Sequence, residues 1–237
     1  MVAPKISVNW EKSVTPVTSE IKSIIRQKRK TAIWLVNDDI LDGPSEEYIT
    51  RLQEHLFHFS LKIDVYGQPP LLRCSSNNCQ KTIRDQYYFY MAFENSFSED
   101  YVTDIVLNGY NNYAVPIVYG GANYSRFLPP DSYINARDFH PYNLAYVMHK
   151  VINDPIRFEG YFRWTNLYTI QDNSGSFTSL CNLCETLHRY KANALQNMSM
   201  KYFRRWWNGL NGMKLCLSPG YWNEKADINA SNIFHLT

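Results

Sequence analysis

The sequence predicts an α/β fold in which a parallel sheet carries helices on both faces. Short apolar stretches with strand-like composition alternate along the chain with segments of helical periodicity. The chain has 237 residues, 45% of them hydrophobic and 19% charged. This length and composition are typical of a globular chain that buries a large core without metal or disulfide support.

The first half of the sheet is predicted from local patterns. Residues 19–29 form a helix, because isoleucines recur there at helical spacing, and residues 32–36 form a short buried strand. Ser45 is expected to cap the next helix, whose apolar residues continue to Phe57. A second strand follows over residues 61–66 and ends where glycine and two prolines break the pattern.

The second half begins with a cysteine-containing loop over residues 73–85, followed by a dense aromatic strand over 87–93. A helix over about 101–110 and a strand over 114–119 come next. The remaining predicted elements are a short helix near 124–128, a short strand at 133–135, and helices at 141–153 and 155–169. In such open sheets, ligands bind beyond the carboxyl ends of the strands. The turns after Phe93 and Tyr119 are therefore the predicted site.

We expect one folded unit over residues 18–190. Residues 1–17 are aperiodic and contain proline and serine, which predicts a flexible lead-in. Residues 191–237 follow as a C-terminal tail with no assigned motif.

Composition excludes several classes of function. The net charge is +2, and the densest basic run, Arg26–Lys30, fits the solvated last turn of a helix, so no nucleic acid partner is expected. The glycine-rich fingerprints of dinucleotide and P-loop sites are absent, and no cofactor is expected. The sequence shows neither a signal peptide nor the roughly 18 apolar residues that a membrane span needs.

The five cysteines favour disulfides over a zinc site. Cys181 and Cys184 have zinc-knuckle spacing, but no second half-site with that spacing accompanies them. The disulfide candidates are Cys74, Cys79, Cys181 and Cys184. A metal site built from His55, His58 and cysteines is the alternative, although a solvent-exposed helix face explains both histidines, and no metal is expected.

Three sequons fit a glycosylating, oxidising compartment. Their asparagines are Asn123, Asn197 and Asn229.

The segment with the most chemistry is the loop after the aromatic strand, residues 93–104. It combines carboxylates, an amide and hydroxyl groups at a strand-to-helix junction, which suits a phosphate and ribose hydroxyls. The simpler interpretation is that Asp100 caps the following helix and that the other residues are a polar loop. The residues alone do not distinguish a phosphate and ribose site from a helix cap with a polar loop.

The sequence of this region resembles that of glycosyltransferase family 10, the α-1,3/4-fucosyltransferases. The family's donor-binding signature runs Phe-Glu-Asn-Ser, a spacer, and Asp-Tyr-(Val/Ile)-Thr-Glu-Lys, and residues 93–104 are similar to it. The resemblance continues through Tyr113–Tyr124, Arg126–Pro130 and Tyr161–Trp164. It covers roughly residues 30–190 and is most similar to the arthropod members that fucosylate the innermost GlcNAc of N-glycans.

The resemblance implies a fold and a reaction. The fold is the Rossmann-like C-terminal lobe of a GT-B architecture, which binds GDP-fucose as donor substrate. The reaction transfers fucose with inversion to a GlcNAc 3-hydroxyl of a glycoprotein N-glycan. The general base lies in the amino-terminal lobe, so no catalytic residue is expected in this chain. The family works on the lumenal side of the Golgi membrane, and a membrane contact is expected only through an anchor that this chain does not show.

By position, the resemblance also assigns the donor-binding residues. They are Glu94, Asn95, Tyr101, Val102, Thr103 and Asp104, with Asp104 at the family's ribose-binding glutamate.

Two family cations are replaced. Ile105 stands at the lysine that contacts the diphosphate, and Ser45 stands where the family usually has an arginine. A charge-assisted hydrogen bond contributes roughly 1.5–3 kcal/mol, so the loss of both weakens donor binding unless neighbours such as Arg84 or Arg126 compensate. Two interpretations follow: a fucosyltransferase donor lobe, or a non-catalytic fucosyltransferase-like protein or fragment that has lost the acceptor lobe and these cations.

Overall fold

The structure is a computed structural model of the chain. The residues that it describes are 2–4, 16–36, 44–67, 76–98, 100–170, 180, 181, 184, 185, 187 and 188. The predicted tail over 191–237, Cys74, Asn197 and Asn229 lie outside the described residues.

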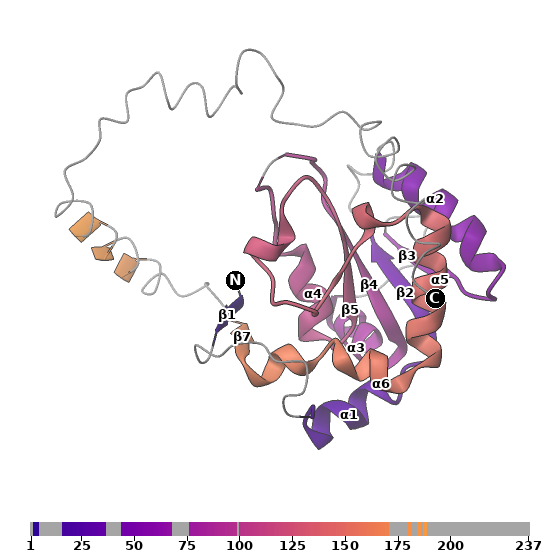
Figure 1. The fold of residues 1–237 in the computed structure, drawn as a ribbon, viewed down its shortest axis with the longest axis horizontal. Coiled ribbons are helices and arrows are strands. Elements are labelled where there is room, and N and C mark those ends of the chain that lie inside the picture. The colour runs from indigo at the N-terminus through magenta and orange to yellow at the C-terminus, as the bar shows by residue number, and fades with distance from the viewer. Residues whose placement is uncertain are drawn as a thin grey trace, which may run out of the picture.

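Five parallel strands form the central sheet (Figure 1), in the order β3-β2-β4-β5-β6. Each neighbouring pair is parallel. The strands are β2 Lys30–Leu35, β3 Ile63–Tyr66, β4 Tyr87–Phe93, β5 Val115–Tyr119 and β6 Ile134–Asn135. The predicted α/β fold class with a parallel sheet is confirmed.

Helices pack on both faces of the sheet and leave two separate hydrophobic clusters. The cluster on the first face includes buried residues of α1 Ser19–Ile25, α2 Pro44–Phe57, α5 Pro141–Asn153 and α6 Pro155–Gly160. The cluster on the second face includes buried residues of α3 Ser76–Gln86 and α4 Ile105–Asn111.

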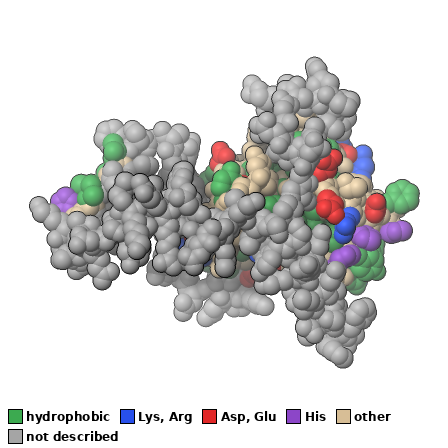
Figure 2. All heavy atoms as spheres, turned by 90° about the horizontal axis from the view of Figure 1, so that it is seen from above, with side chains coloured by type: hydrophobic (Ala, Val, Ile, Leu, Met, Phe, Trp, Pro, Cys, Tyr) green, Lys and Arg blue, Asp and Glu red, His purple; other side chains and the backbone are tan. Residues whose placement is uncertain are grey.

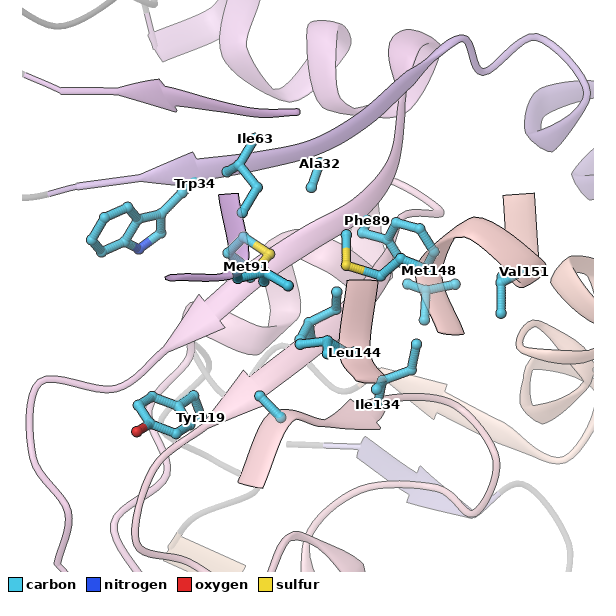
Figure 3. Packing of buried hydrophobic residues seen from close by; sticks show 14 of the residues in the cluster. Ala32, Trp34, Ile63, Phe89, Met91, Tyr119, Ile134, Leu144, Met148 and Val151 are labelled. Carbon is cyan, nitrogen blue, oxygen red and sulfur yellow. The ribbon is translucent and has the colours of Figure 1, made fainter. Parts of the chain in front are cut away.

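Alternation along the strands separates the two clusters. Trp34 and Met91 belong to the first cluster, whereas their chain neighbours Ile33 and Tyr90 belong to the second. Figure 3 shows the first cluster, with Met148 of α5 among the strand side chains. Each strand is therefore covered on both faces, which accounts for the nearly continuous apolar runs in the sequence.

Most predicted elements lie within a few residues of the observed ones, and β4 and α5 have the predicted bounds. The helix at Ser45 begins one residue earlier, so Ser45 lies buried in its first turn rather than capping it. Proline is well tolerated there because the first turn does not use its missing N–H. The loop predicted over 73–85 is wrong for residues 76–86, which form α3. Cys79 and Ile83, four residues apart, bury one face of that helix.

The helix predicted over 155–169 is also wrong in its second half. The structure ends α6 at Gly160, continues with a 3₁₀ helix over Arg163–Asn166, and forms strand β7 at Tyr168–Ile170. Phe162 belongs to the first cluster and Trp164 to the second. A helix packed on one face of the sheet could not bury residues in the clusters of both faces, so the chain leaves the helix between α6 and Trp164.

Part of the predicted flexible lead-in has a regular structure. Val2–Pro4 forms strand β1, which pairs antiparallel with β7. Val17, at the end of the predicted lead-in, is buried in the first cluster. A short apolar segment that finds an open strand edge gains backbone hydrogen bonds that local periodicity does not reveal.

A buried lysine joins the amino ends of β2 and β4 to the two helices of the second face. Lys28 is fully buried, and its Nζ donates to the carbonyl oxygens of Ile83 at 3.3 Å, Arg84 at 2.9 Å and Asn112 at 3.3 Å. These carbonyls belong to the last turns of α3 and to the C-cap of α4. Lys28 therefore satisfies acceptors that the ends of both helices leave open.

Replacing this lysine should cost more stability than replacing a surface lysine. Lys28→Met keeps the length of the side chain but removes the donor to three carbonyls, and we expect a loss of about 2 kcal/mol in the free energy of unfolding. Lys22→Met is the matched control, because Lys22 forms a partly exposed ion pair with Glu159 at 2.8 Å and should lose under about 1 kcal/mol. Urea denaturation measures both. Equal losses would contradict the role of Lys28.

The same lysine predicts a dependence of stability on pH. Burial lowers the pKa of Lys28 from 10.5 to about 7, against an opposing effect of Asp85. Between these two pH values the unfolded chain holds the proton and the folded chain releases it, so the free energy of unfolding should rise with pH. Denaturation curves between pH 7 and 10 should show this rise in the parent chain and a smaller rise in Lys28→Met. Parallel pH profiles would contradict the assignment.

Candidate functional site

The candidate site lies where β4, β5 and β6 end. These strands are neighbours in the sheet, with Phe93 paired to Tyr119 and Val118 paired to Asn135. Because the strands are parallel, the loops that follow them meet at one edge. The predicted juxtaposition of the turns after Phe93 and Tyr119 is confirmed.

A buried carboxylate organises the loop after β4. Glu94 is 2% exposed, and its Oε1 accepts a hydrogen bond from the Thr103 backbone N–H at 2.9 Å. The Thr103 hydroxyl donates to Oε2 at 2.8 Å. Burial raises the pKa of Glu94, and the two hydrogen bonds from Thr103 oppose that rise. These two hydrogen bonds fix the path of the loop between β4 and α4 by holding its two ends together.

Two glycines let the loop after β5 approach this carboxylate. A Cβ on Gly120 would lie 2.5 Å from the Tyr124 hydroxyl and 3.0 Å from the Glu94 Cγ. A Cβ on Gly121 would overlap the backbone of Phe97 and Ser98. The Gly-Gly pair is therefore required by close packing, because no side chain fits between the two loops.

An arginine from the third strand holds the same turn. Arg137 follows β6, and its Nη1 donates to the backbone oxygens of Gly120 at 2.9 Å and Ala122 at 3.4 Å. Sequence reasoning missed Arg137 as a site residue. Its contact crosses 17 residues, and the available signal is its position two residues after the short strand β6.

A second arginine joins the loops after β4 and β5. Arg126, in the 3₁₀ helix Tyr124–Arg126, donates through Nη1 to Asp100 Oδ1 at 2.6 Å and Oδ2 at 2.7 Å. Both side chains are exposed. Asp100 has a φ of 58°, so the loop turns sharply at the residue before Tyr101. Asp100 therefore pairs across the site, and it does not cap α4, which begins at Ile105.

The structure divides the six predicted donor-binding residues into two groups. Asn95, Tyr101 and Asp104 are exposed, and Asp104 makes no capping hydrogen bond at the start of α4. Glu94 and Thr103 bond each other, while Val102 packs against the second cluster. The first group is open to a ligand, and the second group shapes the loop.

The two residues that replace the family's cations lie at packed positions. Ile105 is half-buried and packs against the second cluster, and Ser45 is buried in α2. Of the two compensating residues considered from sequence, Arg126 lies at the site. Arg84 does not, because it lies in the last turn of α3 just before β4 begins, at the opposite end of the strand, over the Tyr113 ring.

The cysteine prediction is confirmed for one residue and wrong for two. Cys79 is disulfide-bonded, with its partner outside the described residues. Cys181 and Cys184 are free and exposed. The Cys184 sulfur lies 3.7 Å from His188 Nδ1, one helical turn further on, so it is directed along the chain rather than toward Cys181. Asn123 is exposed, and its Oδ1 accepts from the backbone and hydroxyl of Ser125.

The histidines considered as a metal site, His55 and His58, lie in the last turn of α2 and directly after it. His55 of α2 lies 6.0 Å from His140, ring to ring, and Phe59 stacks on His149 at 4.8 Å. In Figure 2, several histidine side chains lie beside charged and hydrophobic side chains at the right-hand end of the view. Partial burial, His140 and His58 lower the pKa of His55. Within the described part of the chain, no three His, Cys, Asp or Glu residues could jointly hold a metal ion, and no helix there could cross a membrane.

The clamp between Glu94 and Thr103 predicts a stability effect. In Thr103→Val the Glu94 Oε2 loses its hydroxyl donor while remaining buried, which should lower the free energy of unfolding by about 1–3 kcal/mol. Thr50→Val, at an exposed position of α2, should change it by under about 0.5 kcal/mol. Chemical denaturation measures both variants. A Thr103→Val chain as stable as the parent would contradict the clamp.

Comparison with known proteins places the chain in a family. The model of the C-terminal part of glycosyltransferase family 10 (fucosyltransferase) matches residues 25–206. Alpha-(1,3)-fucosyltransferase C of Drosophila melanogaster is 34% identical over 192 residues, which are 79% of this chain and 43% of that protein. The Homo sapiens 3-galactosyl-N-acetylglucosaminide 4-alpha-L-fucosyltransferase FUT3 is 36% identical over 169 residues, 68% of this chain and 44% of that protein.

Solved structures of an alpha1,3-fucosyltransferase are also similar. The complex with GDP has a TM-score of 0.48 at 18% identity, covering 58% of this chain and 39% of that one. The chain spans under half the length of the curated relatives it matches. From the extent of the family match and the identity to its members, the chain belongs to glycosyltransferase family 10, the fucosyltransferases.

Proposed function

We propose that this chain is the donor-binding half of an α-1,3-fucosyltransferase and binds GDP-fucose at the loops after β4, β5 and β6. The observation that carries the proposal is the clamp between Glu94 and Thr103. It uses the buried polar groups internally and leaves Asn95, Tyr101 and Asp104 exposed on one loop. Family membership supports fucosyl transfer as the reaction.

Each exposed residue has a role that fits its chemistry. The Asp104 carboxylate makes no capping bond, so it is available to accept hydrogen bonds from ribose hydroxyls. The Tyr101 ring, 37% exposed, offers a flat face to a base or sugar. The Asn95 amide donates and accepts beside them.

The diphosphate requires cations, and Arg126 is placed to supply one. Its pair with Asp100 is exposed on both sides, and such pairs contribute only about 0–1 kcal/mol. A diphosphate with two or more negative charges competes well for the guanidinium, which binds phosphate in a bidentate geometry. Arg126 then compensates in part for the lysine that Ile105 replaces.

For the whole protein we propose transfer of fucose, with inversion, to the 3-hydroxyl of a GlcNAc in an N-glycan. A carboxylate within hydrogen-bond reach of that hydroxyl would act as general base; the family resemblance assigns it to the amino-terminal lobe. We place the protein at the lumenal side of the Golgi membrane. The disulfide at Cys79 supports an oxidising compartment, and the exposed Asn123 sequon is consistent with glycosylation there.

The second candidate is a non-catalytic fucosyltransferase-like protein. Ile105 favours it, because an apolar side chain packed against the second cluster replaces a diphosphate contact. The two candidates differ in whether the chain binds GDP as it stands.

Calorimetric titration of the full chain distinguishes them. The donor-lobe proposal predicts that GDP binds and that GMP binds at least about tenfold more weakly, because a phosphate contact is lost. Ile105→Lys should strengthen GDP binding by about tenfold or more. Ile156→Lys, which adds the same charge at a position of α6 that is 77% exposed, should leave it unchanged.

Two results would count against the donor-lobe proposal. If only Ile105→Lys binds GDP, the fold is intact and the chain is the non-catalytic relative. If neither chain binds GDP while both unfold cooperatively, the loops do not form a nucleotide site.

A further inference from the structure

A cavity lies beside the candidate donor site, at the outer edge of the sheet. It has a volume of about 410 Å³ and lies between β6, α5 and α6. Among the described strands, β6 is the last in the sheet order and pairs with β5 alone. The volume is at the lower end of the range typical of small-molecule sites.

The walls of this cavity combine aromatic rings with a few polar groups. Tyr133, Phe139 and Tyr161 line it together with aliphatic side chains from β6 and α5. Its acidic residues are Asp131 and Asp138. The remaining polar lining residues are Ser125, Asn135 and Arg157.

The charges exclude one class of ligand. Two carboxylates and one guanidinium line the cavity, so these side chains sum to a formal charge of about −1 at neutral pH. A phosphate or nucleotide would meet like charge there. A neutral ligand therefore fits this lining better than a diphosphate does.

We propose that this cavity binds a neutral pyranose sugar. A pyranose has an apolar C–H face, which packs on aromatic rings, and a rim of hydroxyl groups that both donate and accept hydrogen bonds. The carboxylates of Asp131 and Asp138 accept from such hydroxyls, and Arg157 donates to them. A neutral ligand with an apolar face and a rim of hydroxyl groups can therefore contact both the aromatic rings and the polar side chains.

The placement of the polar groups supports this ligand. Asn135 donates from Nδ2 to Asp138 Oδ1 at 3.2 Å, which orients the carboxylate. Arg157 forms no ion pair with a carboxylate among the described residues, so its guanidinium is available to a hydroxyl. The recognition groups thus come from three separate elements around one opening.

The cavity is a neighbour of the donor site but distinct from it. Ser125 lines the cavity, while the next residue, Arg126, pairs with Asp100 at the donor loop. The rings of Tyr124 and Tyr133 lie 6.1 Å apart between the two sites. Sugar binding here does not rest on donor binding, and the two can be measured separately.

Saturation-transfer NMR on the full chain, first without GDP and then with GDP added, tests the proposal. The probes are the methyl glycosides of N-acetylglucosamine, galactose and mannose, and we expect at least one to bind with a Kd of about 1–10 mM. Asp138→Ala and Arg157→Gln should each weaken that binding about threefold to tenfold, as expected for one lost hydrogen bond. The matched controls are Glu54→Gln and Arg26→Gln, at exposed positions of α2 and at the end of α1, and both should bind as the parent does.

Three outcomes would overturn it: no saturation of any glycoside, equal binding by the cavity variants and the controls, or displacement of the sugar by GDP. The last would place the sugar in the donor site. A chain that fails to bind GDP but binds the glycoside through Asp138 and Arg157 would leave this proposal standing while the donor-lobe proposal fails.

Discussion

The site depends on one constraint: a carboxylate that is 2% exposed at the end of β4 must have hydrogen-bond partners. Thr103 provides both, through its backbone N–H and its hydroxyl. The partner comes nine residues later, so the loop between them has to fold back before α4 begins. Once it does, Asn95, Tyr101 and Asp104 are left on its open side. A single buried contact thus determines which polar groups of the loop face solvent.

The neighbouring loops follow from the first. Gly120 has no side chain, and this lets the turn after β5 reach the Glu94 methylene groups, while Arg137 holds that turn from β6. Parallel pairing brings all three strand ends to one edge. Rigid strands therefore carry the site, and the loops between them are fixed by specific contacts. Such preorganisation reduces the entropy lost when a ligand binds.

Local patterns predicted the fold well because its strands and helices are mostly regular. The dense aromatic run predicts β4 and the helical periodicity predicts α5, and both elements have the predicted bounds. What sequence could not show are contacts between distant residues. The pairing of Arg126 with Asp100 spans 26 residues. After the end of α6, Phe162 packs in the cluster of one face of the sheet and Trp164 in that of the other, and local periodicity does not show which face a residue packs on.

The family resemblance named six site residues, and only the structure separates those that are open from those that hold the loop. The structure also shows how position 105 could accommodate the lysine of the family. The side chain is half-buried against the second cluster, yet a lysine stem can cover the same apolar surface while its ammonium reaches solvent. The fold does not therefore require isoleucine at this position. The absence of the lysine charge at position 105 therefore affects the proposed ligand site rather than the core. In the proposed donor site, Arg126 would supply the cation for the diphosphate, and its weak surface pair with Asp100 can exchange. If the chain binds the donor as proposed, its affinity for the diphosphate depends on how readily the Arg126–Asp100 pair opens.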